Sequence, residues 1–319
     1  MKYIFICFIS LLFANSLLAQ QTPRFTQFTL NNLGNNPAYA GTHAAQVEFM
    51  AGNRQQWTGF AGAPITTFFG VSYGHRGKYN YKGIHGFSAY VESDNAAGLK
   101  NNSFYVGYAY HLRLINGVNI GFGLMAGSRT FSMSSRLFNS ADPAFINTRS
   151  FVTTYPDFIT GLRLYSKRFF MDLSIRQLYK NKIAQGSDKL GTNAKLTPHY
   201  YFTYGRKISI GYNNYVLVPA IHIQSNLTSI PQIDLNSMIY FTKKVGIGLN
   251  YRVANSFSGI VQINIFKNAI VGISYDYTTN NFSPAAMNTV EIMFGFSPMM
   301  GSDKYSRSVN VVKCPSFDY

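Results

Sequence analysis

Apolar and aromatic side chains alternate with small or polar ones along most of this chain, and this two-residue period constrains the fold more than any other feature. In residues 245–253 every odd position is apolar or aromatic, whereas every even position is Gly, Asn or Arg. Successive side chains of a β-strand point to opposite faces, so the pattern predicts a strand with one apolar and one polar face. The same period recurs in residues 104–111, 261–265 and 271–277.

The number of alternating segments predicts a closed barrel. Beyond the first 19 residues, no stretch reaches the roughly 18 consecutive apolar residues that a membrane helix needs, so any bilayer span must be built from strands. Counting segments of about 8 to 11 residues gives about fourteen strands, an even number as bacterial barrels require. We expect them near residues 46–56, 65–74, 83–92, 103–113, 118–130, 155–165, 168–176, 199–207, 215–224, 233–241, 245–253, 257–266, 269–277 and 288–296.

Connection lengths suggest the two ends of such a barrel. Very short turns, such as Lys267–Asn268, fit the periplasmic side, whereas residues 131–154 and 177–198 are longer, polar and predicted to be extracellular loops. A soluble β-sandwich also alternates, because its inner face is apolar. Here the bulky faces carry apolar and Tyr side chains, and aromatics make up 16% of residues, as in the girdles of membrane barrels. We therefore predict an all-β, transmembrane antiparallel β-barrel.

The N-terminus has the features of a secretory signal peptide. A short basic start precedes the apolar run 3–18, and Ala19 offers a small residue at the cleavage point. A transmembrane anchor is the competing interpretation, but no cluster of charges follows the run. Position 20 is Gln rather than Cys, so the lipoprotein pattern is missing. We expect a signal peptide over 1–19, an N-terminal segment at the barrel mouth over 20–45, the barrel over 46–296 and a C-terminal tail over 297–319.

Charge is strongly unbalanced, with 28 Lys and Arg against 12 Asp and Glu and a formal net charge of +16. We predict that inward charges form a lumen network of salt bridges, with an anion path as the alternative. Loop cations would face lipopolysaccharide phosphates or acidic parts of a partner protein, and nucleic acid is not expected in this compartment. The predicted inward charges are Arg113, Arg163, Arg176 and Arg252 with Asp172, Asp276 and Asp234, and Arg176 is expected to pair with Asp172.

No enzyme, cofactor or metal is predicted. Residues 70–74 match a nucleophile-elbow pattern but lie within an alternating strand, and no helix follows them. The histidines lack metal-ligand spacing, and His85 and His111 are the one pair expected to meet in the lumen. Because Cys7 belongs to the signal peptide, Cys314 of the tail is a lone thiol, expected to be inert.

Several short motifs occur in an order that resembles the PorP/SprF family, which comprises outer-membrane barrel proteins of the type IX secretion system. The motifs are Pro23-Arg24-Phe25-Thr26-Gln27-Phe28, Asn36-Pro37-Ala38-Tyr39-Ala40-Gly41, Arg54-Gln55-Gln56-Trp57, Gly62-Ala63-Pro64, the turn from Asp94 to Gly98, and Val290-Glu291-Ile292-Met293-Phe294-Gly295-Phe296. The resemblance implies an outer-membrane barrel that works with type IX secretion components and with a secreted adhesin carrying a type IX C-terminal domain. Such proteins support adhesin secretion, surface attachment and gliding, or link to periplasmic ring proteins.

Two roles remain open for the residues that carry this resemblance. They either pack the N-terminal segment across the barrel mouth or form a surface that a partner recognises. The residues are Asn36, Pro37, Tyr39, Gly41, Arg54, Gln55, Trp57 and Pro64. The alternative functions are a diffusion or transport barrel, preferring anions or hydrophobic solutes, and an outer-membrane enzyme.

Overall fold

The structure is a computed structural model that describes most of the region predicted to form the barrel. It describes residues 22–42, 47–76, 83–133, 151–179, 196–211, 215–241, 244–266, 268–279 and 288–298. The predicted signal peptide, Cys314 and nearly all of the C-terminal tail lie outside these residues, as does most of the two predicted extracellular loops.

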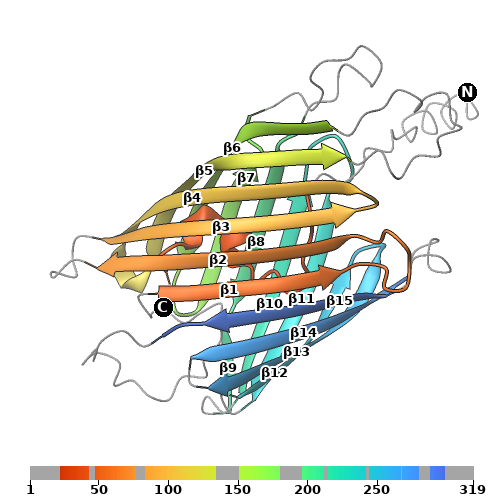
Figure 1. The fold of residues 1–319 in the computed structure, drawn as a ribbon. Coiled ribbons are helices and arrows are strands. Elements are labelled where there is room, and N and C mark those ends of the chain that lie inside the picture. Colours follow the sequence, from red (N-terminus) through yellow and green to blue (C-terminus); the bar gives the residue numbers. More distant parts are fainter. Residues whose placement is uncertain are drawn as a thin grey trace, which may run out of the picture.

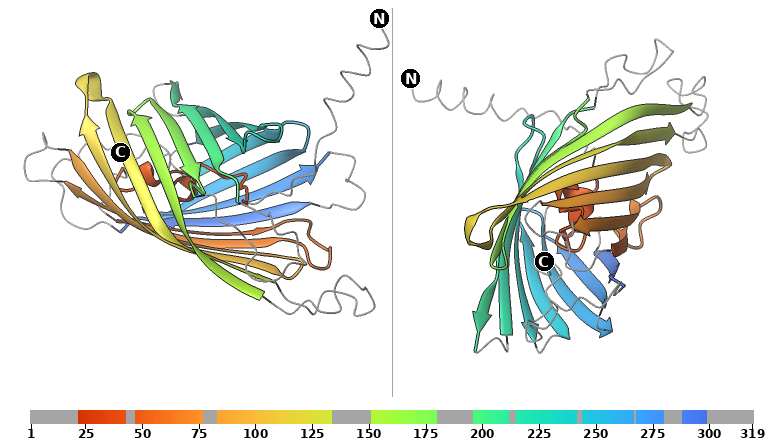
Figure 2. Two further views of the ribbon diagram at one scale, coloured as in Figure 1. Left: turned by 90° about the horizontal axis from the view of Figure 1, so that it is seen from above. Right: turned by 90° about the vertical axis from the view of Figure 1, so that its left-hand side faces the viewer.

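Fourteen long antiparallel strands form a closed barrel, which confirms the predicted fold (Figures 1 and 2). No helix in the described stretches is long and apolar enough to span a bilayer. The long strands are β1 (Val47–Gln55), β2 (Ile65–Arg76), β3 (Ile84–Ala96), β4 (Leu99–Arg113), β5 (Asn119–Met133), β6 (Phe151–Tyr165), β7 (Phe169–Arg176), β8 (His199–Arg206), β10 (Tyr215–Ser225), β11 (Gln232–Phe241), β12 (Val245–Arg252), β13 (Ser256–Phe266), β14 (Ala269–Thr278) and β15 (Thr289–Phe296). The remaining elements are the short strand β9 (Ile208–Ile210), the helix α2 (Asn32–Asn35) and the 3₁₀ turns η1 (Pro37–Tyr39) and η2 (Ile115–Gly117).

The ring closes because the first and last long strands pair with each other. β1 pairs with β2 on one side and with β15 on the other, where Arg54 lies directly opposite Glu291. β10 pairs with both β8 and β11, and the short β9 extends the β8 side of that ladder. Closure leaves no exposed edge with unpaired backbone groups, which is what a strand protein needs in lipid.

Several strands extend further than the hydrophobic alternation predicts. β3 continues to Ala96 and β4 begins at Leu99, where Ser93 Oγ donates a hydrogen bond of 2.7 Å to Asn102 Oδ1. Most of the added residues, 93–95 and 100–102, are polar, and they point to both faces. Beyond an apolar belt both faces of a strand meet water, so the alternation ends while backbone pairing continues.

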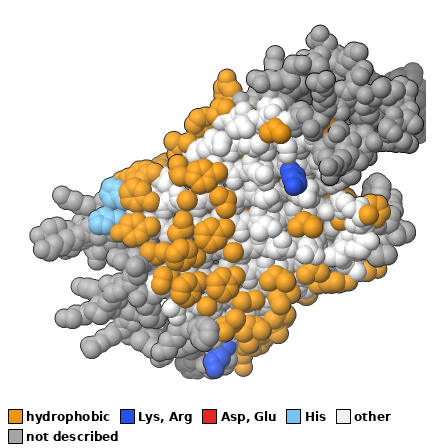
Figure 3. Space-filling model, in the orientation of Figure 1, with side chains coloured by type: hydrophobic (Ala, Val, Ile, Leu, Met, Phe, Trp, Pro, Cys, Tyr) orange, Lys and Arg blue, Asp and Glu red, His pale blue; other side chains and the backbone are white. Residues whose placement is uncertain are grey.

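The outer face is apolar and the inner face is polar. On β12, Ile247 and Leu249 point outward and are 48% and 71% exposed, whereas Asn250 and Arg252 point inward and are buried. On the face drawn in Figure 3, hydrophobic side chains gather over the left and lower parts of the described surface, and few charged groups lie among them. This is the distribution expected when lipid surrounds the barrel.

The two ends of the barrel differ in the lengths of their connections. We call one end the turn end, where η2 and residues 166–168 connect neighbouring strands, and the other the loop end, where β5 and β7 end and β6 and β8 begin. β1 begins at the turn end, and β15 finishes there.

Replacing Leu249 by Arg should strongly destabilise the barrel, because a charge in the middle of a lipid-facing strand costs about 2–4 kcal/mol near the bilayer midplane. Leu227→Arg is the matched control, since Leu227 is 72% exposed in the β10–β11 connection at the loop end. Guanidinium unfolding in lipid vesicles would measure both variants. Equal stability of the two would show that the outer face of β12 does not meet lipid.

Candidate functional site in the barrel lumen

Residues 22–42, which we call the lumen segment, run through the inside of the barrel from the loop end to the turn end. Thr22 Oγ1 accepts hydrogen bonds from Tyr201 Oη at 3.1 Å and from Gln224 Nε2 at 2.7 Å, near the loop end. At the other extreme, the Gly41 amide donates to Ser72 Oγ at 2.9 Å. The expectation that this part of the chain lies across the barrel mouth is therefore wrong for the described residues, because the inner wall offers polar partners along its whole length.

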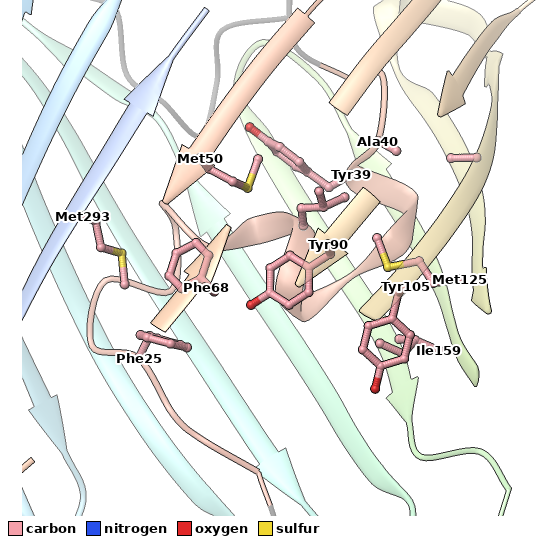
Figure 4. Packing of buried hydrophobic residues seen from close by; sticks show 12 residues of the cluster. Phe25, Tyr39, Ala40, Met50, Phe68, Tyr90, Tyr105, Met125, Ile159 and Met293 are labelled. Atoms are coloured by element: carbon pink, nitrogen blue, oxygen red, sulfur yellow. The ribbon is translucent and has the colours of Figure 1, made fainter. Parts of the chain in front are cut away.

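Apolar packing fills the middle of the lumen around this segment. Phe25 and Tyr39 of the lumen segment pack with Met50, Phe68 and Tyr90 of the wall, and Figure 4 shows Phe25 beside Phe68 and Met50 beside Tyr39. The rings of Phe25 and Phe68 meet edge to face at 5.1 Å between centroids. The interior thus combines a small hydrophobic core with a polar wall.

The Asn36–Pro37 turn is fitted against strands β6 and β7. Asn36 Oδ1 caps η1 by accepting from the Ala38 amide at 2.9 Å, and its Nδ2 donates to Leu162 O and to Asp172 Oδ1, both at 3.0 Å. An Asn cap followed by Pro at the first helical position is a strong local signal for such a turn. A side chain at Gly161 would collide with Asn36 Oδ1, so the wall must be bare at that position.

Gly41, next to the last residue of the lumen segment, has a backbone conformation that favours glycine. Its φ is +79°, and a Cβ atom there would lie 2.8 Å from Gly86 Cα. Backbone passes close to backbone at this point, which requires the absence of side chains on both residues.

The strongest polar anchor joins the lumen segment to the seam that closes the barrel. Arg54 Nη1 lies 3.1 Å from Asp276 Oδ2 and also contacts Glu291 Oε1 directly. Glu291 accepts from the amides of Thr26, at 2.7 Å, and Gln27, at 3.1 Å, and Thr26 Oγ1 donates to Asp276 at 2.8 Å. Asp276 and Glu291 therefore share the guanidinium of Arg54. The lumen segment supplies additional hydrogen-bond donors to both carboxylates.

Apart from Arg113, the other predicted inward charges also meet carboxylate or guanidinium partners, but one predicted pair is different. Arg163 pairs with Asp172 at 2.7 Å and Arg252 pairs with Asp234 at 2.7 Å. The predicted pairing of Arg176 with Asp172 is wrong, since Arg176 lies 3.2 Å from Glu92. Asp172 is instead opposite Arg163 in the β6–β7 register. It therefore pairs with this neighbour on the adjacent strand and not with Arg176 on its own strand.

Three further charged residues of the lumen, Arg129, Glu92 and Asp157, were not predicted. Arg129 is fully buried, with Nη2 at 4.0 Å from Glu92 Oε1 and Nε at 3.8 Å from Asp157 Oδ2. Tyr105 Oη also donates to Asp157 at 2.6 Å. The strand period places all three charges on inward positions, so the same alternation that identified Arg163 is sufficient to find them.

Two predictions about lumen residues are not confirmed: the inward charge at Arg113 and the pairing of His85 with His111. Arg113 is exposed at the turn end of β4 and has no ion pair among the described residues. His85 and His111 do not meet, because Ile84 is the residue opposite His111. His85 points outward, within 2.8 Å of Tyr108 Oη, whereas His111 Nε2 lies inside at 2.8 Å from Ala40 O. A one-residue offset moves a strand side chain to the other face.

The residues carrying the family resemblance fall into two groups. Asn36, Pro37, Tyr39, Gly41 and Arg54 are buried in the lumen, where the guanidinium of Arg163 lies 5.0 Å from the centroid of the Tyr39 ring. The other group lies at the loop end: Gln55 ends β1, Pro64 O accepts from the Gln56 amide at 2.9 Å, and Trp57 is 36% exposed with a φ of 54°.

The described residues contain no set of three or more His, Cys, Asp or Glu side chains placed to hold a metal ion. The serine of the nucleophile-elbow pattern, Ser72, points into the lumen and binds the Gly41 amide. The inward charges are arranged to hold the lumen segment and the wall together, which is a structural arrangement.

A double-mutant cycle should distinguish the observed partner of Arg176 from the predicted one. We expect Arg176→Ala and Glu92→Gln to be coupled by about 1–3 kcal/mol in unfolding free energy, because each removes the nearest ion-pair partner of the other buried group. Arg176→Ala and Asp172→Asn should be additive within about 0.5 kcal/mol. Guanidinium unfolding of the single and double variants gives both values, and the reverse order would contradict the observed pairing.

Gly161→Ala should destabilise the protein by about 1–3 kcal/mol, since the added methyl group forces Asn36 away from Asp172. Gly259→Ala is the matched control, because Gly259 faces outward and a Cβ there meets nothing within 4 Å. Thermal unfolding in detergent compares the two. If both variants unfold at the same temperature as the parent protein, the lumen segment is not packed against β6 as described.

Comparison with solved structures shows the same kind of barrel. The chain is similar to the CymD monoaromatic hydrocarbon channel, with a TM-score of 0.52 and 9% identity, covering 85% of this chain and 93% of that one. It is also similar to a Pseudomonas aeruginosa FadL homologue, with a TM-score of 0.49 and 9% identity, covering 82% of this chain and 93% of that one. At this identity the likeness to CymD shows the fold alone.

Sequence comparison identifies the family. No curated protein sequence matches the chain significantly. The profile of the family described as type IX secretion system membrane protein PorP/SprF, however, matches residues 17–296, which include all the strands and the lumen segment. The chain therefore belongs to the PorP/SprF family of type IX secretion system membrane proteins, and it is a β-barrel of the outer membrane.

Proposed function

We propose that this barrel is a binding platform for proteins of type IX secretion and has no catalytic activity. In this role it supports the secretion or surface attachment of a large adhesin, including one of the gliding type, or links the outer membrane to periplasmic ring proteins. The observation that carries the proposal is the lumen segment, which is fixed to the inner wall by the anchor at Arg54, Asp276 and Glu291. A barrel filled in this way is suited to presenting surfaces at its two ends.

The alternative is a diffusion channel for anions or hydrophobic solutes. CymD, one of the similar structures, is a monoaromatic hydrocarbon channel, and this motivates the alternative. For a solute to pass, the lumen segment would have to move. This movement would break several buried hydrogen bonds and the packing contacts of Phe25 and Tyr39. Breaking a buried ionic network leaves uncompensated charge and costs several kcal/mol, so the platform is the favoured function.

The loop end offers the surface for an extracellular partner. Bacterial barrels place short turns in the periplasm and long loops outside, so the loop end faces out. There Trp57 and Phe60 are 36% and 60% exposed in the β1–β2 connection, and exposed aromatic rings are frequent anchors in protein interfaces. Arg54, by contrast, is buried and would act on a partner only through the fold. Outside the barrel, membrane lipids and lipopolysaccharide are the partners that we propose for the apolar belt and the loop cations.

A strain lacking the protein should lose one large protein, such as an adhesin, from its surface or medium while keeping normal permeability to small solutes. Quantitative proteomics of cells and medium, together with uptake of small sugars and dyes, measures both. Unchanged secreted and surface proteomes with reduced uptake of a nutrient would instead establish the transport function.

Complementation of that strain with point variants locates the docking surface. The Trp57→Ala/Phe60→Ala variant should reach the outer membrane yet fail to restore the missing protein, and Ile230→Ala should restore it, since Ile230 is an exposed apolar residue elsewhere at the loop end. Arg54→Ala should lower the level of the barrel itself. Full restoration by the Trp57/Phe60 variant would move the docking surface away from the β1–β2 connection.

A further inference from the structure

A cavity of about 730 Å³ opens at the turn end of the barrel, next to the end of the lumen segment. Thr42, His111 and Tyr165 line its inner part, and Arg113, Lys167 and Arg168 line its outer part. The last three come from the end of β4 and from the β6–β7 connection. The cavity therefore lies within the ring of strands and faces the periplasm, because the turn end carries the short connections.

The cations of this cavity differ from those of the lumen. Arg54, Arg163, Arg176 and Arg252 each have a carboxylate within 3.2 Å. Arg113, Lys167 and Arg168 are exposed, and their side chains form no ion pair with any residue that the structure describes. The described residues that line the cavity include no Asp or Glu. Within this part of the chain, the wall of the cavity consequently has an uncompensated positive charge.

We propose that this cavity binds an acidic peptide segment of a periplasmic protein. The volume is that of a pocket for a ligand of drug size or a few peptide residues and is far larger than an inorganic anion requires. A lipid headgroup does not fit this position, because the acyl chains of a lipid lie outside the ring of strands whereas the cavity lies inside it. Carboxylates are the natural partners of Arg and Lys in a partly dehydrated site. The inference rests on the proposed platform function and names the chemistry of its periplasmic contact.

The purified full-length protein in phosphatidylcholine nanodiscs tests this binding directly. The probe is a fluorescein-labelled hexaglutamate peptide, followed by fluorescence anisotropy, with hexaglutamine as the uncharged comparison. We expect saturable binding of hexaglutamate alone, and Lys167→Gln/Arg168→Gln should raise its Kd about tenfold. Arg113→Gln is an independent second variant at the same cavity, expected to raise the Kd severalfold.

Lys244→Gln is the matched control, because Lys244 is an exposed cation in the β11–β12 connection at the same end but outside the cavity. Its Kd should stay within twofold of the parent value. An equal loss in Lys244→Gln would reduce the effect to the general positive charge of the barrel and overturn the proposal. Absence of saturable binding would overturn it as well, as would complete displacement of the peptide by millimolar inorganic phosphate, which would identify a small-anion site. Each of these results is independent of whether the deletion strain loses a surface protein.

Discussion

Arg54 and the two carboxylates that it shares, Asp276 and Glu291, are the interaction on which the rest of the interior depends. Arg54 and Glu291 lie opposite each other in the pairing of β1 with β15, so the contact spans the seam that closes the barrel. Two buried carboxylates against one guanidinium leave a negative charge that must be stabilised by further donors. The Thr26 and Gln27 amides and the Thr26 hydroxyl supply them, so closing the barrel and filling it are coupled.

The inner wall is shaped to receive the lumen segment. Side chains at Gly123 and Gly161 would collide with the Asn36–Ala38 turn, and one at Gly86 would collide with the backbone at Ala40. Small inward residues of a barrel usually make room for solvent or solute, but here they make room for the chain itself. This arrangement explains why Asn36, Pro37 and Gly41 are needed together: the turn must be short, capped and free of side chains where it meets the wall.

Much of the barrel could be predicted because its determinants are local. Alternation along each strand needs only neighbouring residues, and it located the fourteen strands and the inward position of Arg163, Asp172, Arg176, Arg252 and Asp276. Strand ends were predicted less well, as at Ala96 and Leu99, because pairing continues where both faces are wet. The outward face of His85 was also missed, although His85 has the same parity on β3 as the outward Phe87 and Val91.

The sequence by itself determined that this chain forms an outer-membrane barrel with an apolar outside, a charged inside and a family motif before the first strand, because side-chain period and motif order are properties of the chain alone. Tertiary structure decided which charges meet, so that Arg176 pairs with Glu92 and Asp172 with Arg163. It also decided that the motif fills the lumen, and that Arg54 is buried while Trp57 is partly exposed. These outcomes depend on strand register and barrel closure, which bring together residues as far apart in the chain as Arg54 and Glu291.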